Sequence, residues 1–287
     1  MNRVETPAHF ELLLMDARSR QGQQGRVSHC YLLANEVSRL CDQGLLFYEN
    51  QDAGLLLFNV RGRDVLLSMV VCPETPIDDR VFSRFGRPVR CEFPSRGGRY
   101  PPDVASLMGM LKKCGFAPEA SATRMAMVPL PAIRDQILSH RHPGSITVEP
   151  AGAELADDIM SLWEETFDCA ANGVPTRDEL IPLLRLGRVI YAQGGDSRLA
   201  GALLSEFCDR CGWVWHVAVG AEFRGMGIGR ALMSEYHKTG LGRPEPVRAF
   251  RLWVSDKDLG AEAFHTKLGY RPDGRESVSF IHLASRK

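Results

Sequence analysis

Residues 224–232 combine three glycines and two arginines in a pattern that suits the binding of an anion. The apolar residues 213–219 before this segment are typical of a strand, and residues 231–238 after it are typical of a helix. A turn between a strand and a helix start presents free backbone N–H groups, and the helix dipole adds positive potential there. Glycines let the backbone approach a phosphate closely, and Arg224 and Arg230 add positive charge. The segment therefore predicts a phosphate-binding turn.

The spacing of the glycines excludes two common phosphate loops. The segment lacks the Gly-Lys-Ser/Thr ending of nucleoside-triphosphate loops, and its glycines follow G-x-G-x-G rather than the dinucleotide pattern G-x-G-x-x-G. Its pattern of Arg-x-x-Gly-x-Gly resembles the loop with which the GNAT acetyltransferase family holds the diphosphate of acetyl-CoA. The resemblance covers about residues 145–285.

A second segment, residues 258–270, strengthens this resemblance. The family typically has Asn-x-x-Ala-x-x-x-Tyr-x-x-x-Gly-Phe on a helix that follows a strand. Here Ala261, Gly269 and Tyr270 match, and Asp258 replaces the asparagine. His265 stands where the family usually has a tyrosine that often protonates the leaving thiolate of coenzyme A.

The resemblance implies an α/β fold with a mixed sheet in which the strands before and after the phosphate loop splay apart. The pantetheine arm of acetyl-CoA would enter there and pair with the backbone of Val217 and Val219. A backbone N–H near Val217 or Ala218 would bind the thioester oxygen. The implied cofactor contacts are Val217, Ala218, Val219, Arg224, Gly225, Met226, Gly227, Ile228, Gly229, Arg230, Ala231, Asp258, Ala261 and His265.

The residues that handle protons are less clear from the sequence. Many family members carry Glu or Tyr at the position of Trp213, and tryptophan cannot act as a base. The remaining candidates are His265, Glu206 and His216. A neutral imidazole with a pKa near ~6.5 both accepts and donates protons, which favours His265 as the acid for the thiolate.

Three tryptophans are expected to line the site of the acceptor. Strict alternation along the strand places Trp213 and Trp215 on one face with Val217 and Val219, and Val214, His216 and Ala218 on the other. With Trp253, the first two would form an apolar wall that lowers the pKa of an acceptor amine by desolvation.

The chain length of 287 residues favours two domains, and the Pro/Gly break at residues 141–144 places their boundary. We predict domains at 1–142 and 143–287. In the second, the expected order is β-α-α-β-β-β-α-β-α-β. In the first, strands are expected at 45–48, 54–59, 64–71, 89–93 and 124–128, and a helix at 103–114.

The first domain reads as a degenerate copy of the second. Residues 111–118 resemble 266–272, which indicates a tandem repeat with a period of roughly 150 residues. Residues 72–88 carry no Arg-x-x-Gly-x-Gly pattern. We therefore expect two GNAT-like domains in tandem, of which only the second has a complete acetyl-CoA loop.

Composition narrows the class of protein further. Equal numbers of basic and acidic residues, 35 each, favour neither nucleic acid nor a membrane surface as a partner. The eight scattered cysteines, the absence of a visible signal peptide and the lack of a long apolar run predict a cytoplasmic protein with free thiols. Cys208 and Cys211 have C-x-x-C spacing without a second ligand pair, so we expect a strand–strand turn there and no metal.

The sequence as a whole predicts an acetyl-CoA-dependent N-acetyltransferase, monomeric or homodimeric, that modifies a primary amine of a small molecule or peptide. The alternative is a sensor or interaction protein that binds coenzyme A or an acyl-CoA without catalysis. His265 and Trp213, at the two proton-handling positions, keep this alternative open.

Overall fold

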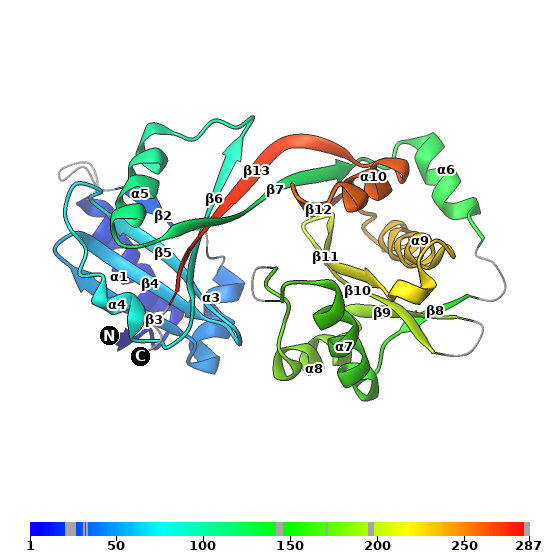
Figure 1. The fold of residues 1–287 in the computed structure, drawn as a ribbon, viewed down its shortest axis with the longest axis horizontal. Coiled ribbons are helices and arrows are strands. Elements are labelled where there is room, and N and C mark those ends of the chain that lie inside the picture. Colours follow the sequence, from blue (N-terminus) through cyan, green and yellow to red (C-terminus); the bar gives the residue numbers. More distant parts are fainter. Residues whose placement is uncertain are drawn as a thin grey trace. The chain divides into compact units, whose positions relative to one another are not determined.

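The computed structural model describes residues 1–20, 27–30, 32, 34–141, 146–169, 172–194 and 198–283. Contacts divide the chain into two compact units, unit 1 (residues 1–121 and 276–287) and unit 2 (residues 122–275). The predicted boundary at 142/143 differs from this division, because residues 122–142 group with unit 2 and the last residues group with unit 1. The chain thus passes between the units twice, within β7 (Ala117–Met127) and within β13 (Arg271–His282) (Figure 1).

Unit 2 contains the predicted order of elements. After β7 and α6 (Pro131–Ser139), the chain forms β8 (Thr147–Pro150), α7 (Ala156–Thr166), α8 (Arg177–Arg185), β9 (Val189–Gln193), β10 (Leu199–Cys208), β11 (Cys211–Val219), α9 (Ile228–Leu241), β12 (Ala249–Ser255), α10 (Leu259–Lys267) and the start of β13. The strands lie in the order β7-β12-β11-β10-β9-β8; of these neighbouring pairs, β11 and β12 are parallel and the others are antiparallel.

Helices cover both faces of the unit 2 sheet (Figure 1). On one face, an α9-side core contains Leu203, Val214, Leu232, Tyr236 and Phe250. On the other face, an α7-side core contains Ile159, Trp163, Leu180, Leu204 and Ala218. Because Leu203 and Leu204 belong to different cores, β10 keeps the regular alternation of a strand buried on both faces.

A β-bulge changes the alternation that the sequence predicts for β11. Val214 pairs with Ser205 but His216 pairs with Leu204, so Trp215 is an extra residue between them. Val214 consequently packs in the α9-side core with Val217 and Val219, while His216 contacts Trp163 on the α7 side. The expectation that Val214 shares a face with His216 and Ala218 is therefore wrong.

Unit 1 repeats the order of elements seen in unit 2. It contains β1 (Asn2–Arg3), α1 (Pro7–Ser19), β2 (Val27–His29), α3 (Ala34–Gln43), β3 (Leu46–Gln51), β4 (Gly54–Val60), β5 (Val65–Val71), α4 (Arg80–Ser83), β6 (Val89–Arg96), α5 (Pro102–Lys113) and the start of β7. This confirms the tandem arrangement. The sequence assigned no element before residue 45, and so missed α1, which begins at the N-cap Thr6 with Pro7 in its first turn.

Among the described residues, two differences between the units concern a helix and a strand. The helix α4 has four residues where its counterpart α9 has 14. Unit 1 also has the additional short strand β2, which pairs antiparallel with β5. Among the described residues of the whole chain, no helix is long and apolar enough to cross a membrane.

Candidate functional site

The parallel strands β11 and β12 pair only along the first part of β11. Cys211–Val214 pair with Ala249–Leu252, and the described residues provide no further pairs between the two strands. β11 continues to Val219, while β12 continues to Ser255 in pairing with β7. The edge of β11 from Trp215 to Val219 that faces away from β10 is therefore open to a ligand that pairs like a strand.

The glycine-rich turn follows directly from this open edge. Gly225 and Gly227 have φ values of 77° and 87°, a conformation that favours glycine, and Gly227 caps α9. The first helical hydrogen bond runs from the Ala231 N–H to the Gly227 carbonyl. The N–H groups of Ile228, Gly229 and Arg230 precede that bond and point out of the helix start, as an anion requires.

Close packing at the start of α9 explains why residue 229 is a glycine. A Cβ atom on Gly229 would lie 3.3 Å from Cζ of Phe264 and 3.5 Å from a methyl group of Val219. Phe264 on α10 therefore lies where β11 ends and α9 begins, and it packs with Val217, Val219 and Ala261 on the α9-side core. The sequence analysis did not name Phe264, although it stands three residues after Ala261 on the same helical face.

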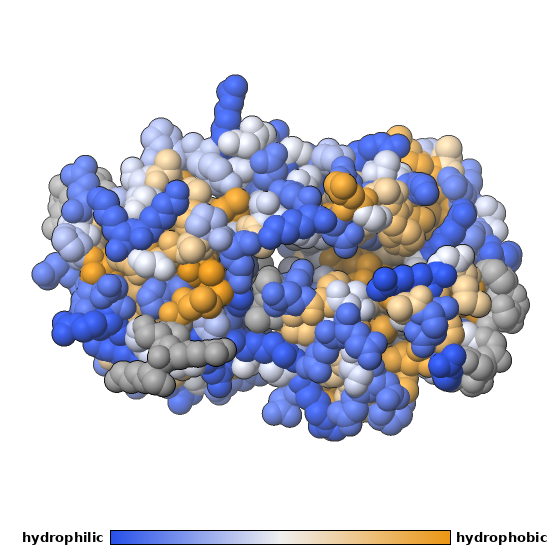
Figure 2. Space-filling model, viewed as in Figure 1, coloured by the Kyte–Doolittle hydropathy of each residue, from blue (hydrophilic) through white to orange (hydrophobic). Residues whose placement is uncertain are grey.

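The rim of this region is apolar as well as basic. Met226 in the turn and Leu259 at the start of α10 are 61% and 73% exposed, and Figure 2 shows apolar surface around α9 and α10. Arg224 is exposed, and its Nε donates a hydrogen bond of 3.4 Å to the Val219 carbonyl. Arg230 is also exposed, and it lines a small hollow together with Lys267 and His140.

The residues of α10 that were expected to contact the cofactor have clear structural partners. The Asp258 carboxylate caps the helix by accepting a 2.8 Å hydrogen bond from the Ala261 N–H. His265 is only 4% exposed and lies against Phe264 and Tyr270. Burial lowers the pKa of His265 to about 4, while Asp258 opposes the shift. The His265 imidazole is therefore mainly neutral at pH 7.

A buried polar pair lies beside His265 and was not expected from the sequence. The Tyr270 hydroxyl and His237 Nε2 are hydrogen bonded at 2.8 Å, and burial lowers the pKa of His237 to about 3. Tyr270 fills the position of the phenylalanine in the family pattern, so its hydroxyl needs this partner in the core.

The other two proton-transfer candidates lie on the opposite face of the sheet from His265. His216 is buried between Trp163 and Phe167, and burial lowers its pKa to about 4. Glu206 forms an ion pair of 3.0 Å with Arg188 and is the cross-strand partner of Trp213. Cross-strand partners share a face, so Glu206, Trp213 and His216 all face the α7 side.

The tryptophans form a layer beside these groups. Trp213 and Trp215 stack with ring centroids 5.9 Å apart, and Trp215 is 50% exposed. The Arg124 guanidinium lies 5.8 Å from Trp213 and 6.0 Å from Trp253, and its NH2 forms a 2.6 Å ion pair with Asp273. Because of the bulge, the wall of Trp213 and Trp215 lies on the face opposite to Val217 and Val219, which corrects the predicted grouping.

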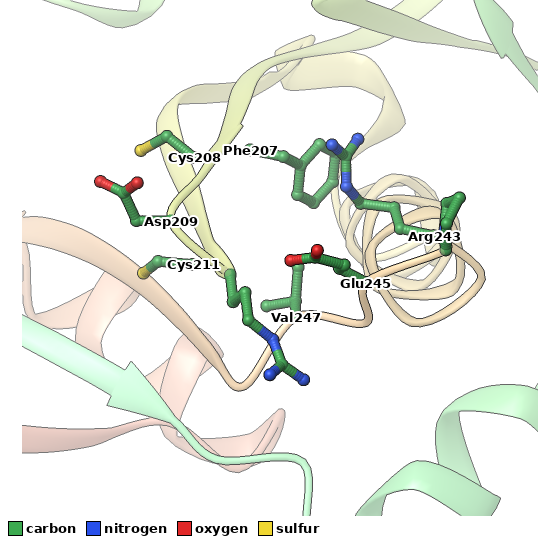
Figure 3. A pocket seen from close by; sticks show the side chains of 9 residues that line it. Phe207, Cys208, Asp209, Cys211, Arg243, Glu245 and Val247 are labelled. Atoms are coloured by element: carbon green, nitrogen blue, oxygen red, sulfur yellow. The ribbon is translucent and has the colours of Figure 1, made fainter.

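A separate hollow of about 370 Å³ lies at the other end of β11 (Figure 3). It is lined by the β10–β11 turn and by the Arg243–Val247 segment, and Arg243 stacks over Phe207 at 5.0 Å. Cys208 and Cys211 flank the two-residue turn of Asp209 and Arg210, as expected. Both thiols are free, and no group of three possible metal ligands occurs among the described residues.

Comparison with known protein families agrees with the resemblance that the sequence motifs of residues 145–285 indicate. Residues 156–270 match the model of the acetyltransferase (GNAT) family. A comparison with curated protein sequences finds no match. Among solved structures, a tandem GNAT protein from the clavulanic acid biosynthesis pathway has a TM-score of 0.58 at 15% identity. The match covers 82% of this chain and 80% of that protein's chain.

Two further structures resemble most of the chain. A GCN5-related N-acetyltransferase from Sphaerobacter thermophilus has a TM-score of 0.54 at 18% identity. The match covers 98% of this chain and 95% of the Sphaerobacter chain. A GCN5-related N-acetyltransferase from Kribbella flavida has a TM-score of 0.52 at 17% identity, and the match covers 85% of this chain and 93% of the Kribbella chain. At these identities the likeness concerns the fold.

Proposed function

We propose, from the match of residues 156–270 to the model of the acetyltransferase (GNAT) family, that the protein transfers the acetyl group of acetyl-CoA to a primary amine of a small molecule or peptide. The observation that carries the proposal is the open edge of β11 at Trp215–Val219, which leads directly into the glycine-rich start of α9. One element offers strand-like pairing to an amide-rich arm, and the next offers free N–H groups to a diphosphate.

The residues present fit acetyl-CoA sterically. The space around the Cβ position of Gly225 is open to 4 Å, and the positive φ of Gly227 turns the backbone at the helix start. The N–H groups of Ile228, Gly229 and Arg230 bind the diphosphate, and Arg224 adds charge beside them. Phe264 and Ala261 support the pantetheine arm from α10. Acetyl-CoA supplies the activated thioester when it is bound, and a β11 N–H at Val217 or Ala218 polarises its oxygen.

The acceptor amine approaches from the α7 face. Trp213 and Trp215 exclude water from it, which lowers the amine pKa and favours the neutral nucleophile. Glu206 and His216 share this face and are the candidates to take its proton. The acceptor would thus reach the thioester from the α7 face, at the gap between β11 and β12 where the arm of acetyl-CoA would pair with the β11 edge.

A second function, binding without turnover, is favoured by the state of His265. Its imidazole is only 4% exposed, and burial lowers its pKa to about 4, which disfavours the imidazolium that would protonate a thiolate directly. A protein that binds acetyl-CoA as a sensor needs no such donor.

One experiment separates the two functions. The release of free thiol from acetyl-CoA is followed with a panel of aliphatic and aromatic amines, next to calorimetric binding of acetyl-CoA. An acetyltransferase releases thiol in proportion to acetylated amine, and mass spectrometry detects the product. A sensor binds acetyl-CoA without amine-dependent release. A chain that shows neither binding nor release contradicts both functions.

A further inference from the structure

Unit 1 contains the same gap between parallel strands that forms the candidate site in unit 2. Its strands β5 and β6 pair in parallel only at Val65–Val89 and Leu66–Arg90. After Leu66, β5 continues for five residues to Val71, as β11 continues for five residues from Val214 to Val219. The segment Met69–Val71 in unit 1 therefore corresponds in position to Val217–Val219 in unit 2.

The inner edges of the two segments are paired alike. Met69, Val70 and Val71 pair with Leu56, Leu55 and Gly54 of β4. Val217, Ala218 and Val219 pair with Leu203, Ala202 and Gly201 of β10. A glycine faces the last residue of the strand in both units, and a Cβ atom on either one would collide with a backbone carbonyl. The two strand pairs are thus equivalent up to their outer edges.

The outer edges differ. In unit 2, the described residues place no strand along Val217–Val219 beyond β10. In unit 1, β2 occupies this edge: Val27 pairs with Val71, Ser28 with Val70 and His29 with Met69. The position that a pantetheine arm would take in a GNAT domain is filled in unit 1 by the chain itself.

Side chains of β2 also close the gap toward β6. His29 is 3% exposed, and its Nδ1 lies 3.8 Å from Sγ of Cys91. Its ring lies 4.5 Å from that of Phe93, centroid to centroid. β2 therefore joins β5 through its backbone and β6 through His29, and Cys91 and Phe93 beneath it are fully buried.

The region that would hold a diphosphate is unsuitable in the same unit. Eight residues separate β5 from α4 (72–79), as eight separate β11 from α9 (220–227). Asp78 and Asp79 end this segment where unit 2 has Met226 and Gly227. The Asp79 carboxylate at this helix start repels a diphosphate, and the Asp78 carboxylate already forms an ion pair of 2.7 Å with Arg80. The four-residue α4 also has little dipole with which to attract an anion.

We propose that β2 is a built-in strand that permanently occupies the acyl-CoA slot of unit 1, so that the protein binds one acetyl-CoA per chain, in unit 2. Unit 1 is then a GNAT fold closed by its own strand β2 rather than a second binding site. The inference rests on the proposed function only in using acetyl-CoA as its probe.

Hydrogen exchange of the full chain, with and without saturating acetyl-CoA, tests the inference. The amides of Met69–Val71 should be protected in the free protein and unchanged by acetyl-CoA, whereas those of Val217–Val219 should gain protection only when it binds. Calorimetry should give one acetyl-CoA per chain. A second equivalent, or a change in exchange at Met69–Val71 on binding, overturns the closed slot. If acetyl-CoA does not change the exchange at Val217–Val219, the proposed function is contradicted. The inference about β2 is then decided by the exchange at Met69–Val71 alone.

Variants of β2 sharpen the test. His29→Ala removes the contacts with Cys91 and Phe93 and should raise both the exchange of Met69–Val71 and the alkylation of Cys91 by roughly tenfold. Ser28→Ala, on the same strand but only half-buried, is the matched control and should leave both rates within about twofold. If Met69–Val71 exchange freely even in the unmodified protein, β2 does not hold the slot.

Discussion

Gly229 and Phe264 approach so closely that a single added methyl group would bring Cβ of residue 229 within 3.3 Å of the Phe264 ring. Gly229→Ala should therefore push Phe264 from its place and weaken acetyl-CoA binding by roughly tenfold, the effect of mild overpacking. Phe264→Leu in the same chain should restore part of the affinity by giving the methyl group room. Calorimetry on the two single variants and the double variant measures this coupling. Strictly additive losses would contradict it.

Gly227→Asp should abolish acetyl-CoA binding, because it adds a negative charge and a side chain at φ 87° where the diphosphate is proposed to lie. Gly187→Asp is the matched control, since Gly187 also has a positive φ and open space around its Cβ position, and it lies after α8 rather than in the turn. Undiminished binding by the Gly227 variant would refute the site.

His265→Ala should lower kcat far more than acetyl-CoA affinity if His265 assists the departure of the thiolate. General acid help is typically worth about 10²–10⁴-fold, and an interaction made only in the transition state is seen in kcat. His265→Tyr should retain part of the rate, because tyrosine also offers a proton donor. If His265→Ala keeps full turnover, His265 is a packing residue, and Glu206→Gln and His216→Gln become the variants to measure.

Trp215→Ala should raise the KM for the acceptor amine and leave acetyl-CoA affinity unchanged, since Trp215 stacks on Trp213 on the face away from Val217 and Val219. Loss of one stacking aromatic predicts an effect of about tenfold. Leu186→Ala, at another exposed apolar residue of unit 2, serves as control. If the KM for the amine and the dissociation constant of acetyl-CoA change equally, Trp215 instead stabilises the β11 edge that binds acetyl-CoA.

The free energy of unfolding should fall as the pH is lowered from about 6.5 toward 4. His216 and His265 are buried with pKa values of about 4, below the ordinary value of 6.5, so the unfolded chain binds protons that the folded chain does not. Their contribution is fully present above pH ~6.5 and is lost toward pH ~4. Denaturant titrations at several pH values measure the slope. His216→Phe, which keeps an aromatic ring beside Trp163, should reduce this slope.

The sequence was sufficient for the parts of the fold that depend on local patterns. The turn at 224–231 and the order of elements in unit 2 both follow from spacing and residue type. In the first half, β3, β4, β5, β6 and α5 lie close to the predicted ranges.

What the sequence could not supply depends on pairing between distant segments. The bulge at Trp215 arises from the register between β10 and β11, and it moves Val214 to the other face from His216. The three residues of β2 carry no periodic signal, and their role follows only from their pairing with β5. The depth at which His265 is buried likewise depends on how α10 packs on the core. The roles of the individual site residues stay predictions.

The exchange of strands through β7 and β13 determines when each half of the protein can fold during synthesis. Unit 2 is one continuous stretch, and its residues leave the ribosome in sequence. Unit 1 needs Phe280, which packs edge-on against Phe93 in its core, and Ser279, whose hydroxyl donates a hydrogen bond to Glu119. These residues are translated after all of unit 2. Unit 1 is synthesised first, but its sheet lacks β13 and cannot be completed until all of unit 2 has emerged from the ribosome.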